Sequence, residues 1–287
     1  MSERRLARII GVMRLVLGTA QWGDPYGVTN AVGRLSDAQI AEIMEVAERA
    51  AISDVDTARG YGDAEQRLLP YVSDFSITTK VSGADDVAGQ VAHSCRDLGI
   101  PALSGVLIHD WEALDCKGQG MSVLTLNQVL DSGTVSRVGG SVYDAAGLES
   151  AAATFDAGGV PLGIVQVPAN VLDRRLDSSS LLRDLAAAGT HVVVRSAFLQ
   201  GVLLSTGGRL ADHPDTVRFR ESVGSTSLLE ACLGHVRGLP WATHVVVGVT
   251  SAAELSEIVA AWNSCTPAVA DPSLESTDLE LIDPRRW

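Results

Sequence analysis

The sequence predicts a single-domain (β/α)8 barrel over residues 1–287, with a core from about residue 14 to residue 262. Short apolar segments of β type alternate with helical patterns along this stretch, and no Pro/Ser-rich linker interrupts them. Most of the β-type segments are apolar at consecutive positions, as in Val192–Val194 and Val245–Val247, which is typical of parallel strands covered by helices. Eight such units favour closure into a barrel.

The predicted strands are short apolar runs that recur at regular intervals. In chain order they are Arg14–Thr19, Ile52–Asp56, Phe75–Lys80, Leu103–His109, Ser136–Ser141, Gly163–Val167, His191–Arg195 and Thr243–Gly248. The first helix is expected after Ser36, because Ser36-Asp-Ala-Gln39 has the form of a capping box and apolar residues follow it at helical spacing. The later helical patterns lie at about 63–72, 84–98, 120–132, 144–157, 178–188, 223–237 and 251–262.

A doubly wound open sheet is the alternative arrangement of the same elements. That fold normally carries a glycine-rich phosphate-binding turn, GxGxxG, after its first strand. Here the turn reads Gly18-Thr-Ala-Gln-Trp-Gly23, which does not match this pattern. The barrel is therefore the favoured fold.

The charge balance argues against polyanionic partners. The chain has 35 acidic and 22 basic residues and a net charge of −13. No cluster of Lys and Arg lines one predicted face, as a nucleic-acid interface requires. The chain is 46% hydrophobic, yet no stretch approaches the roughly 20 apolar residues that cross a bilayer. We therefore expect a globular protein with neither a nucleic-acid nor a membrane partner.

Cysteine spacing and the N-terminal segment favour a cytoplasmic location. The four cysteines lie far apart and form no CxxC pair: Cys95, Cys116, Cys232 and Cys265. Neither a metal site nor a redox pair is predicted from this spacing. Arg8 and Arg14 interrupt the apolar N-terminal stretch, which disfavours a signal peptide. The reducing cytoplasm is the expected compartment.

Two segments depart from the regular alternation. The connection after the seventh predicted strand runs from Ser196 to Glu221, and unstructured loops of that length are usually functional or mobile. It starts at the C-terminal end of a barrel strand, where active sites of this fold lie, so we expect a lid over a ligand rather than a tolerated insertion. The acidic, proline-containing tail, 266–287, is expected to wrap the outside of the barrel.

Four polar residues follow three successive predicted strands. Asp56 and Tyr61 come at and after the end of the second, Lys80 ends the third, and His109 ends the fourth. Neighbouring strand ends of a barrel share one face, so these side chains are predicted to converge on one pocket. Lys80 stands out because only it and Lys117 are lysines. A lysine ending a buried strand suggests a role for a compact, titratable ammonium group.

Two chemistries fit these four residues. In carbonyl reduction, a phenol with an ordinary pKa near 10 needs a nearby cation to donate a proton at neutral pH. Tyr61 would then be the general acid, Lys80 the cation, and Asp56 the group that orients Lys80, while His109 would hydrogen-bond the substrate oxygen. In the second chemistry Lys80 forms a Schiff base, as in a class I aldolase. A lysine paired with a carboxylate stays protonated, which disfavours the second.

The motif around these residues is longer than the tetrad. It comprises Asp56–Glu65, Thr78-Thr-Lys80 and Leu107-Ile-His109, and it resembles the Asp, Tyr, Lys and His tetrad of the aldo-keto reductases. Further similar segments are Leu17–Gly23, Gly139–Ser141, Val165–Asn170, Arg195–Gly201 and Val247–Ser251. The resemblance implies a (β/α)8 oxidoreductase that binds NADPH without a Rossmann domain and reduces an aldehyde or a ketone.

The resemblance also implies which residues hold the cofactor. Ser141 and Gln166 match contacts to the nicotinamide, 198–201 match contacts to the pyrophosphate, and 248–251 match contacts to the adenosine. The expected cofactor residues are Gly18, Thr19, Ser141, Gln166, Arg195, Ser196, Phe198, Leu199, Gly201, Gly248, Thr250 and Ser251.

Two departures from the family pattern concern the cofactor. The family has Asn directly after the serine of its fifth strand, and here the residue is Val142. NADPH-specific members carry a cation around the eighth strand, yet no basic residue lies between Arg237 and Arg285. Glu254 occupies this region, where it is expected to close a capping box with Ser251. NADPH remains the default, NADH is the alternative, and a tail that folds back would restore a cation.

The substrate is expected to be a small carbonyl compound. Trp22, Tyr26 and Trp111 lie in loops after the first and fourth predicted strands, where they would form apolar walls of the pocket or packed loop anchors. Besides the lyase, the alternative is a nucleotide-sensing regulatory subunit, because the potassium-channel β subunits resemble the same family.

Overall fold

Parallel pairing joins each predicted strand to the next one along the chain. β1 (Arg14–Gly18) pairs with β2 (Asp54–Asp56), and pairing continues in order to β8 (His244–Gly248), which pairs back with β1. The strands between them are β3 (Ser76–Val81), β4 (Gly105–Ile108), β5 (Val138–Ser141), β6 (Ile164–Pro168) and β7 (His191–Arg195). The computed structural model, which describes residues 13–83 and 86–287, thus contains a closed eight-stranded barrel. The predicted fold is confirmed, and the open sheet is excluded.

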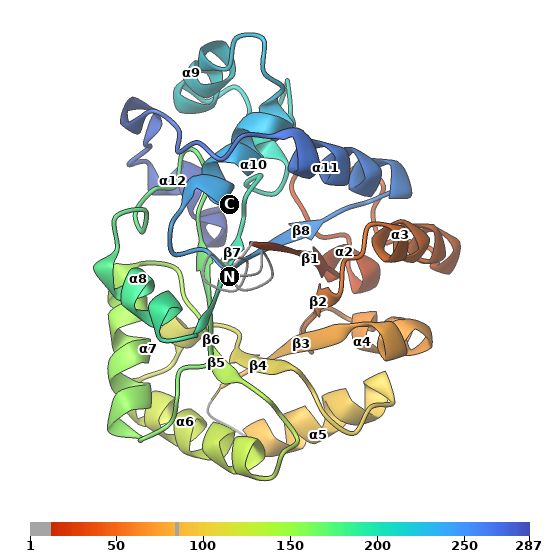
Figure 1. The fold of residues 1–287 in the computed structure, drawn as a ribbon, viewed down its shortest axis with the longest axis vertical. Helices are drawn as coiled ribbons and strands as arrows, with labels where there is room; N and C mark the ends of the chain where they lie inside the picture. The colour runs from red at the N-terminus through yellow and green to blue at the C-terminus, as the bar shows by residue number, and fades with distance from the viewer. Residues whose placement is uncertain (1–12, 84–85) are drawn as a thin grey trace, which may run out of the picture.

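Helices surround the barrel on the outside, as Figure 1 shows. In the described residues they are α2 (Ala20–Gly23), α3 (Asp37–Arg49), α4 (Ala64–Leu68), α5 (Val87–Leu98), α6 (Cys116–Asp131), α7 (Ala145–Ala157), α8 (Ser180–Ala187), α9 (Pro214–Ser222), α10 (Leu228–Gly238), α11 (Ala252–Ser264) and α12 (Leu279–Ile282). The predicted capping box is confirmed, because the Ser36 side chain accepts from the Gln39 backbone N–H and the Gln39 side chain accepts from the Ser36 backbone N–H.

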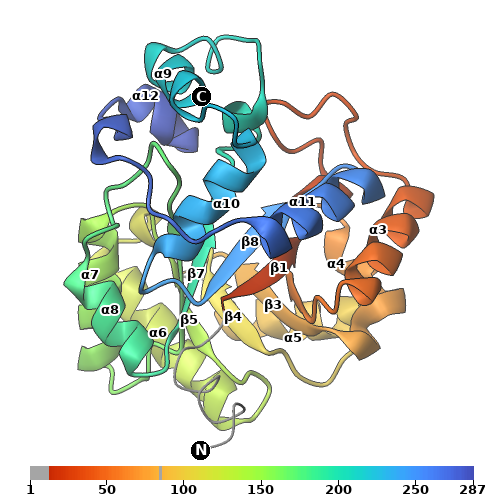
Figure 2. The ribbon, with the colours of Figure 1, turned by 45° about the horizontal axis from the view of Figure 1, so that its top comes forward.

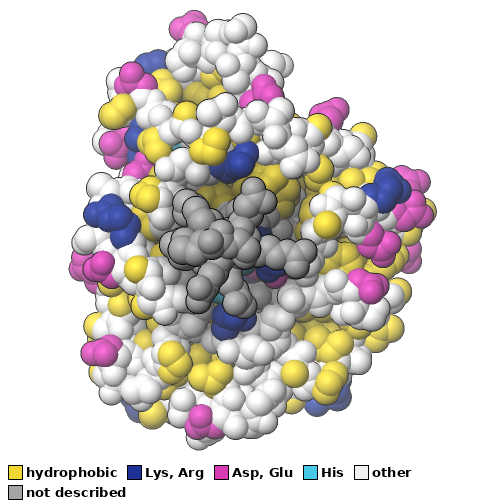
Figure 3. Space-filling view, in the orientation of Figure 1, with side chains coloured by type: hydrophobic (Ala, Val, Ile, Leu, Met, Phe, Trp, Pro, Cys, Tyr) yellow, Lys and Arg dark blue, Asp and Glu magenta, His cyan; other side chains and the backbone are white. Residues whose placement is uncertain are grey.

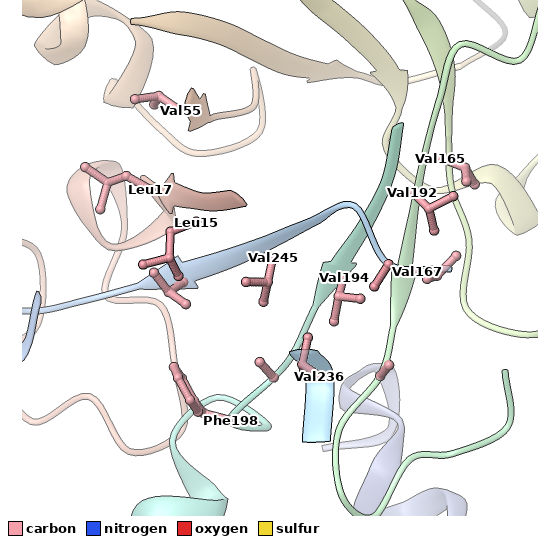
Figure 4. Close-up of a cluster of buried hydrophobic side chains, with 14 of the residues drawn as sticks. Leu15, Leu17, Val55, Val165, Val167, Val192, Val194, Phe198, Val236 and Val245 are labelled. Atoms are coloured by element: carbon pink, nitrogen blue, oxygen red, sulfur yellow. The ribbon is translucent and has the colours of Figure 1, made fainter. Parts of the chain in front are cut away.

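The alternation of side chains along each strand separates the barrel into two layers. Figure 4 shows apolar side chains between strands and helices: Leu15, Leu17, Val192, Val194 and Val245 point outward from the strands, and Val236 of α10 lies in the same cluster. Inside the barrel, Leu107, Ile164 and Val193 form a second buried cluster with Val246 packed against it. Because successive side chains point to opposite faces, Gln166 and Arg195 lie on the inward set two residues after Ile164 and Val193. The side chains that point into the barrel are therefore apolar in the middle of these strands and polar at their C-terminal ends.

The segment after β7 contains structure that its sequence did not predict. A short 3-10 helix, Val202–Leu204, lies within 196–221 and α9 begins there, so the expected structureless loop was wrong in that respect. Figure 2 shows α9 close to α12, and His213 Nε2 lies 3.2 Å from Asp278 Oδ2 between them. Only the first part of the segment, up to Ser205, lines the main cavity. The lid remains a prediction, and only 196–205 lies where a lid over this cavity would be.

The C-terminal tail does more than wrap the outside of the barrel. Leu281 and Ile282 are buried in the main hydrophobic core. Arg285 lies with its guanidinium carbon 3.8 Å from the ring centroid of Tyr143, a residue that lines the main cavity. The expectation for the tail is corrected accordingly, because apolar residues near its end bring it back to the mouth of the barrel.

The surface matches the charge balance of the sequence. Outside the grey atoms, the basic side chains on the face in Figure 3 stand singly and form no continuous patch. No helix within the described residues has the length and apolar character needed to cross a membrane. The apolar N-terminal stretch, from which we predicted that there is no signal peptide, lies largely outside the described residues.

Candidate active site

The four predicted catalytic residues meet at the C-terminal end of the barrel. Asp56 ends β2, Lys80 lies near the end of β3, and His109 directly follows β4. The Lys80 ammonium donates a short hydrogen bond to Asp56 Oδ2 and a 3.2 Å bond to the Tyr61 hydroxyl. A third bond, of 3.1 Å, goes to the carbonyl of Thr57. One ammonium group therefore connects the carboxylate to the phenol.

The Asp56–Lys80 pair is almost completely buried, and hydrogen bonds fix its position. Lys80 is 1% exposed and Asp56 is 4% exposed. Gln166 Nε2 donates to the other carboxylate oxygen of Asp56 at 2.9 Å. Burial by itself lowers the pKa of Lys80, but the charges of Asp56 and Tyr61 and their hydrogen bonds more than offset it, so the pKa is raised. The Lys80 amine is thus protonated at neutral pH and is a poor nucleophile.

The loop after β2 places Tyr61 over this ammonium. Gly23 of α2 packs against the Tyr61 backbone, and a Cβ at this glycine would lie 1.7 Å from the Tyr61 carbonyl oxygen. Any larger residue at position 23 would displace the tyrosine. The Tyr61 ring meets the His109 ring edge to face, with centroids 5.6 Å apart. The phenol is therefore held between a cation and an imidazole.

His109 is a neutral group in this setting. Its burial and the positive charges of Lys80 and Arg195 lower its pKa to about 4. At pH 7 the imidazole therefore carries one N–H and one free lone pair. It can therefore donate a hydrogen bond to a ligand oxygen while it carries no charge.

One large cavity opens above these residues, with a volume of about 530 Å³. Asp56, Tyr61 and His109 line it, while Lys80 lies beneath them. The cavity also gathers most of the expected cofactor residues, namely Gly18, Thr19, Ser141, Gln166, Arg195, Ser196, Phe198, Gly201, Gly248 and Thr250. Leu199 and Ser251 do not line it, because Leu199 is fully buried and the Ser251 hydroxyl caps α11.

Two of the three aromatic residues expected as pocket walls lie elsewhere. Trp22 and Trp111 are fully buried in the hydrophobic core and do not line the cavity. Trp111 packs beside Phe155 at a centroid distance of 5.8 Å, so both tryptophans are loop anchors. Tyr26 does line the cavity, 6.5 Å from the Tyr61 ring. The wall prediction holds only for Tyr26.

Two loops from distant parts of the chain meet at the cavity rim. The Gln200 side-chain oxygen accepts a hydrogen bond from the Val28 backbone N–H at 3.1 Å. The Gln200 backbone carbonyl accepts one from the Thr29 hydroxyl at 2.8 Å. Gly201 has φ +88°, and a Cβ there would lie 2.1 Å from Thr29 Oγ1. Ser196 and Leu199 also have positive φ, and strain of this kind clusters at ligand-binding segments. The contact joins the β1 and β7 loops beside the cavity.

Sequence reasoning missed several residues that line the cavity: Gln21, Thr29, Tyr143, Gln200 and Glu257. Gln21 lies inside the family-like segment Leu17–Gly23 and Gln200 inside Arg195–Gly201, so the resemblance could have indicated both as cavity residues. Tyr143 and Glu257 gave none. The Oε1 atom of Gln21 is buried in the cavity wall without a hydrogen-bond partner in the described structure. A ligand that donates a hydrogen bond would satisfy it.

The cavity wall beside α11 is acidic. Glu254 and Glu257 both line it. The expected capping box forms only in part: Ser251 Oγ accepts from the Glu254 backbone N–H, but the Glu254 carboxylate accepts from the Thr250 backbone N–H at 2.7 Å and from its hydroxyl at 2.9 Å. Arg285 pairs with Asp283 and Arg286 with Glu280, and neither arginine lines the cavity. The tail therefore supplies no cation here.

Comparison with known proteins identifies the family that the sequence resembles. The model of the aldo/keto reductase family matches residues 14–269. A solved protein from Pseudomonas aeruginosa assigned to the aldo-keto reductases is 21% identical with a TM-score of 0.64, covering 88% of this chain and 90% of that chain. The aldo-keto reductase AKR11C1 from Bacillus halodurans, in its holo form, is 17% identical with a TM-score of 0.73, covering 97% of this chain and 98% of that chain. At such identities the two structures support the fold alone.

A comparison with curated protein sequences finds no match. The family match extends over almost the whole barrel and includes all four residues that converge at its C-terminal end. The chain therefore belongs to the aldo/keto reductase family, whose members are oxidoreductases that reduce carbonyl groups.

Proposed function

We propose that this protein reduces an aldehyde or a ketone to the alcohol with a nicotinamide cofactor, and that Tyr61 is the general acid. One observation carries the proposal: the Tyr61 hydroxyl lies 3.2 Å from a buried ammonium and faces a cavity of about 530 Å³. The reduction of a carbonyl creates negative charge on its oxygen. A phenol beside a cation and a neutral imidazole N–H suits that position.

Each residue of the tetrad then has a distinct task. Tyr61 donates the proton, and the Lys80 ammonium stabilises the phenolate that is left. Asp56 keeps Lys80 charged and fixed through the buried ion pair. His109 orients the carbonyl oxygen by a hydrogen bond. The raised pKa of Lys80 disfavours the Schiff-base alternative, which needs a neutral amine.

The cavity also suits a dinucleotide. When bound, a nicotinamide cofactor supplies the hydride. Ser141 and Gln166 would hold its nicotinamide end, and the strained 198–201 turn would hold its phosphates. The unpartnered Oε1 of Gln21 lies in the cavity wall, where a cofactor hydroxyl or amide would satisfy it. These residues support the assignment of a nicotinamide dinucleotide to this cavity.

The first test is turnover itself. We expect the purified protein to oxidise NADH or NADPH when a small aldehyde is added, at a rate in the ordinary enzymatic range of about 1 s⁻¹ or more. Loss of the reduced-nicotinamide absorbance reports the reaction. Tight cofactor binding together with almost no turnover on a broad panel of carbonyls would instead favour the regulatory-subunit alternative.

The cofactor preference is the second test. We expect NADH to bind at least as tightly as NADPH, because Glu254 and Glu257 line the wall where the family resemblance puts the adenosine. A charge-assisted hydrogen bond to the 2′-phosphate is worth roughly 1.5 to 3 kcal/mol, so its absence removes about one to two decades of NADPH preference. Titration of both cofactors by quenching of tryptophan fluorescence measures this.

A charge-neutral variant sharpens the cofactor test. Glu254→Gln keeps one of the two oxygen acceptors for Thr250 but removes one negative charge, so it should raise the affinity for NADPH relative to NADH. Glu149→Gln, on an exposed part of α7, is the matched control and should change neither affinity. Tighter binding of NADPH than of NADH by the wild type would contradict the assignment of this wall.

A further inference from the structure

Glu65 is a buried carboxylate outside the main cavity. It belongs to α4 and is 3% exposed. Both of its oxygens accept hydrogen bonds: Oε1 from the Thr79 hydroxyl at 2.6 Å, and Oε2 from the Arg59 guanidinium at 2.9 Å. Arg59 also donates to Asp97 Oδ2 of α5 at 2.8 Å. None of these four residues lines the main cavity, so Glu65 can affect a bound ligand only through other residues.

The partners of Glu65 lie next to two members of the tetrad. Thr79 directly precedes Lys80 on β3, and Arg59 lies two residues before Tyr61. The Arg59 backbone N–H also donates to the Lys80 carbonyl at 3.0 Å. The Arg59–Glu65 ion pair therefore closes the arc of chain that carries Tyr61. The bond from Thr79 fastens this arc to the strand that carries Lys80.

The alternation of side chains along β3 puts these contacts and the tetrad on opposite sides of the strand. Lys80 points into the barrel, where its ammonium bonds Asp56 and the Tyr61 hydroxyl. Thr79 points the other way, toward the surrounding helices, and is fully buried. Glu65 therefore holds β3 from outside the barrel, one residue before the ammonium group.

The turn that carries Tyr61 needs such support. Tyr61 lies outside any helix or strand, and Gly62 directly after it has φ +56°. A buried ion pair is often no more stabilising than well-packed apolar side chains of the same volume. Its hydrogen bonds are directional, however, and they hold donor and acceptor to within about half an ångström. A carboxylate at position 65 is thus better suited to fixing a distance than to filling space.

We propose that Glu65 is a positioning residue that keeps the Tyr61 hydroxyl at hydrogen-bond distance from the Lys80 ammonium. It acts through Arg59 and Thr79, and it touches neither substrate nor cofactor. The inference rests on the proposed function, because this distance of 3.2 Å affects the rate only if Tyr61 donates the proton. A displacement of about 1 Å at a reacting group lowers the rate by about 100-fold.

Glu65→Gln tests the proposal because the amide keeps the size of the side chain but has only one acceptor oxygen for two donors. It should lower kcat about 10- to 100-fold, while KM for the carbonyl compound and the cofactor affinity stay within about twofold of the wild type. Glu42→Gln makes the same change at an exposed residue of α3 and should keep the wild-type kcat. An unchanged kcat in Glu65→Gln would overturn the proposal.

A double-mutant cycle separates the positioning of Tyr61 from a general weakening of the fold. Tyr61→Phe leaves no hydroxyl to position, so the addition of Glu65→Gln should lower its residual kcat by less than about twofold further. A loss by the same factor in both backgrounds would show a merely structural role for Glu65 and would overturn the proposal.

Thr79 offers a second pair of variants in case Glu65→Gln does not fold. Thr79→Val keeps the shape of the side chain but removes the hydroxyl that bonds Glu65, so it should lower kcat. Thr79→Ser keeps that hydroxyl and should recover most of the loss. Equal values of kcat in the two variants would contradict the role of this contact and overturn the proposal.

Crystal structures of the variants give a readout that does not depend on turnover. In Glu65→Gln or Thr79→Val, the distance from the Tyr61 hydroxyl to Lys80 Nζ should exceed about 3.5 Å, beyond the range of a hydrogen bond. A distance that is unchanged in both variants would overturn the positioning role even if the protein reduces carbonyl compounds. A wild type that reduces none would contradict the proposed function, and the distance would still decide the role of Glu65.

Discussion

Tyr61→Phe should lower turnover by about 100-fold or more and leave cofactor affinity nearly unchanged, which is the usual scale for the loss of a general acid. The phenylalanine keeps the ring that packs edge to face with His109, so the shape of the cavity is preserved. Only the hydroxyl that accepts from Lys80 is removed. Steady-state kcat and a cofactor titration on the same preparation measure the two effects.

The matched control is Tyr71→Phe, which makes the same chemical change in the 3-10 helix Leu69–Asp74, outside the cavity. It should behave as the wild type in both measurements. Near-normal turnover of Tyr61→Phe would show that another group donates the proton and that the mechanism proposed above is wrong.

Lys80→Met should abolish most of the activity, with an effect at least as large as that of Tyr61→Phe. The substitution removes the cation beside the phenol and leaves the Asp56 carboxylate buried without its partner. An unpaired buried charge is destabilising by about 3 to 5 kcal/mol, so a lower melting temperature is expected as well. Turnover and thermal unfolding are measured together.

Two comparisons separate the catalytic effect of Lys80 from the structural one. The double variant Asp56→Asn with Lys80→Met removes both charges, so it should recover stability but not activity. Lys117→Met changes the only other lysine, an exposed residue of α6, and should leave both unchanged. An adduct at Lys80, trapped by borohydride in the presence of a carbonyl compound and found by mass spectrometry, would establish the Schiff-base chemistry instead.

The barrel and its tetrad could be predicted because both follow from local patterns. Apolar runs such as Val192–Val194 indicate buried parallel strands, and a closed barrel brings the ends of β2, β3 and β4 together. Asp56, Lys80 and His109 all lie at such ends. Once the strands are located, the convergence of the tetrad is a geometric consequence of the fold.

The features that were not predicted depend on contacts between distant segments. Trp22 and Trp111 are aromatic residues in loops, a type that often forms pocket walls. Whether such a side chain faces the cavity or the core is decided by the packing around it. Gln200 meets Thr29 across 171 positions of sequence, which no local pattern shows. Arg195 was expected from the sequence as a cofactor residue and does line the cavity, but its lack of an acidic partner among the described residues becomes visible only in three dimensions.

The stacking of Arg285 on Tyr143 places the last few residues against a side chain that lines the main cavity. An affinity tag fused after Trp287 would begin three residues after Arg285, so assays on tagged and cleaved preparations need to be compared. Digestion by a carboxypeptidase that proceeds past Arg285 would uncover one face of the Tyr143 ring while leaving every strand intact. Clipping of the tail during purification would thus remove a contact that supports a cavity-lining residue, and it must be monitored by intact mass before kinetics are interpreted.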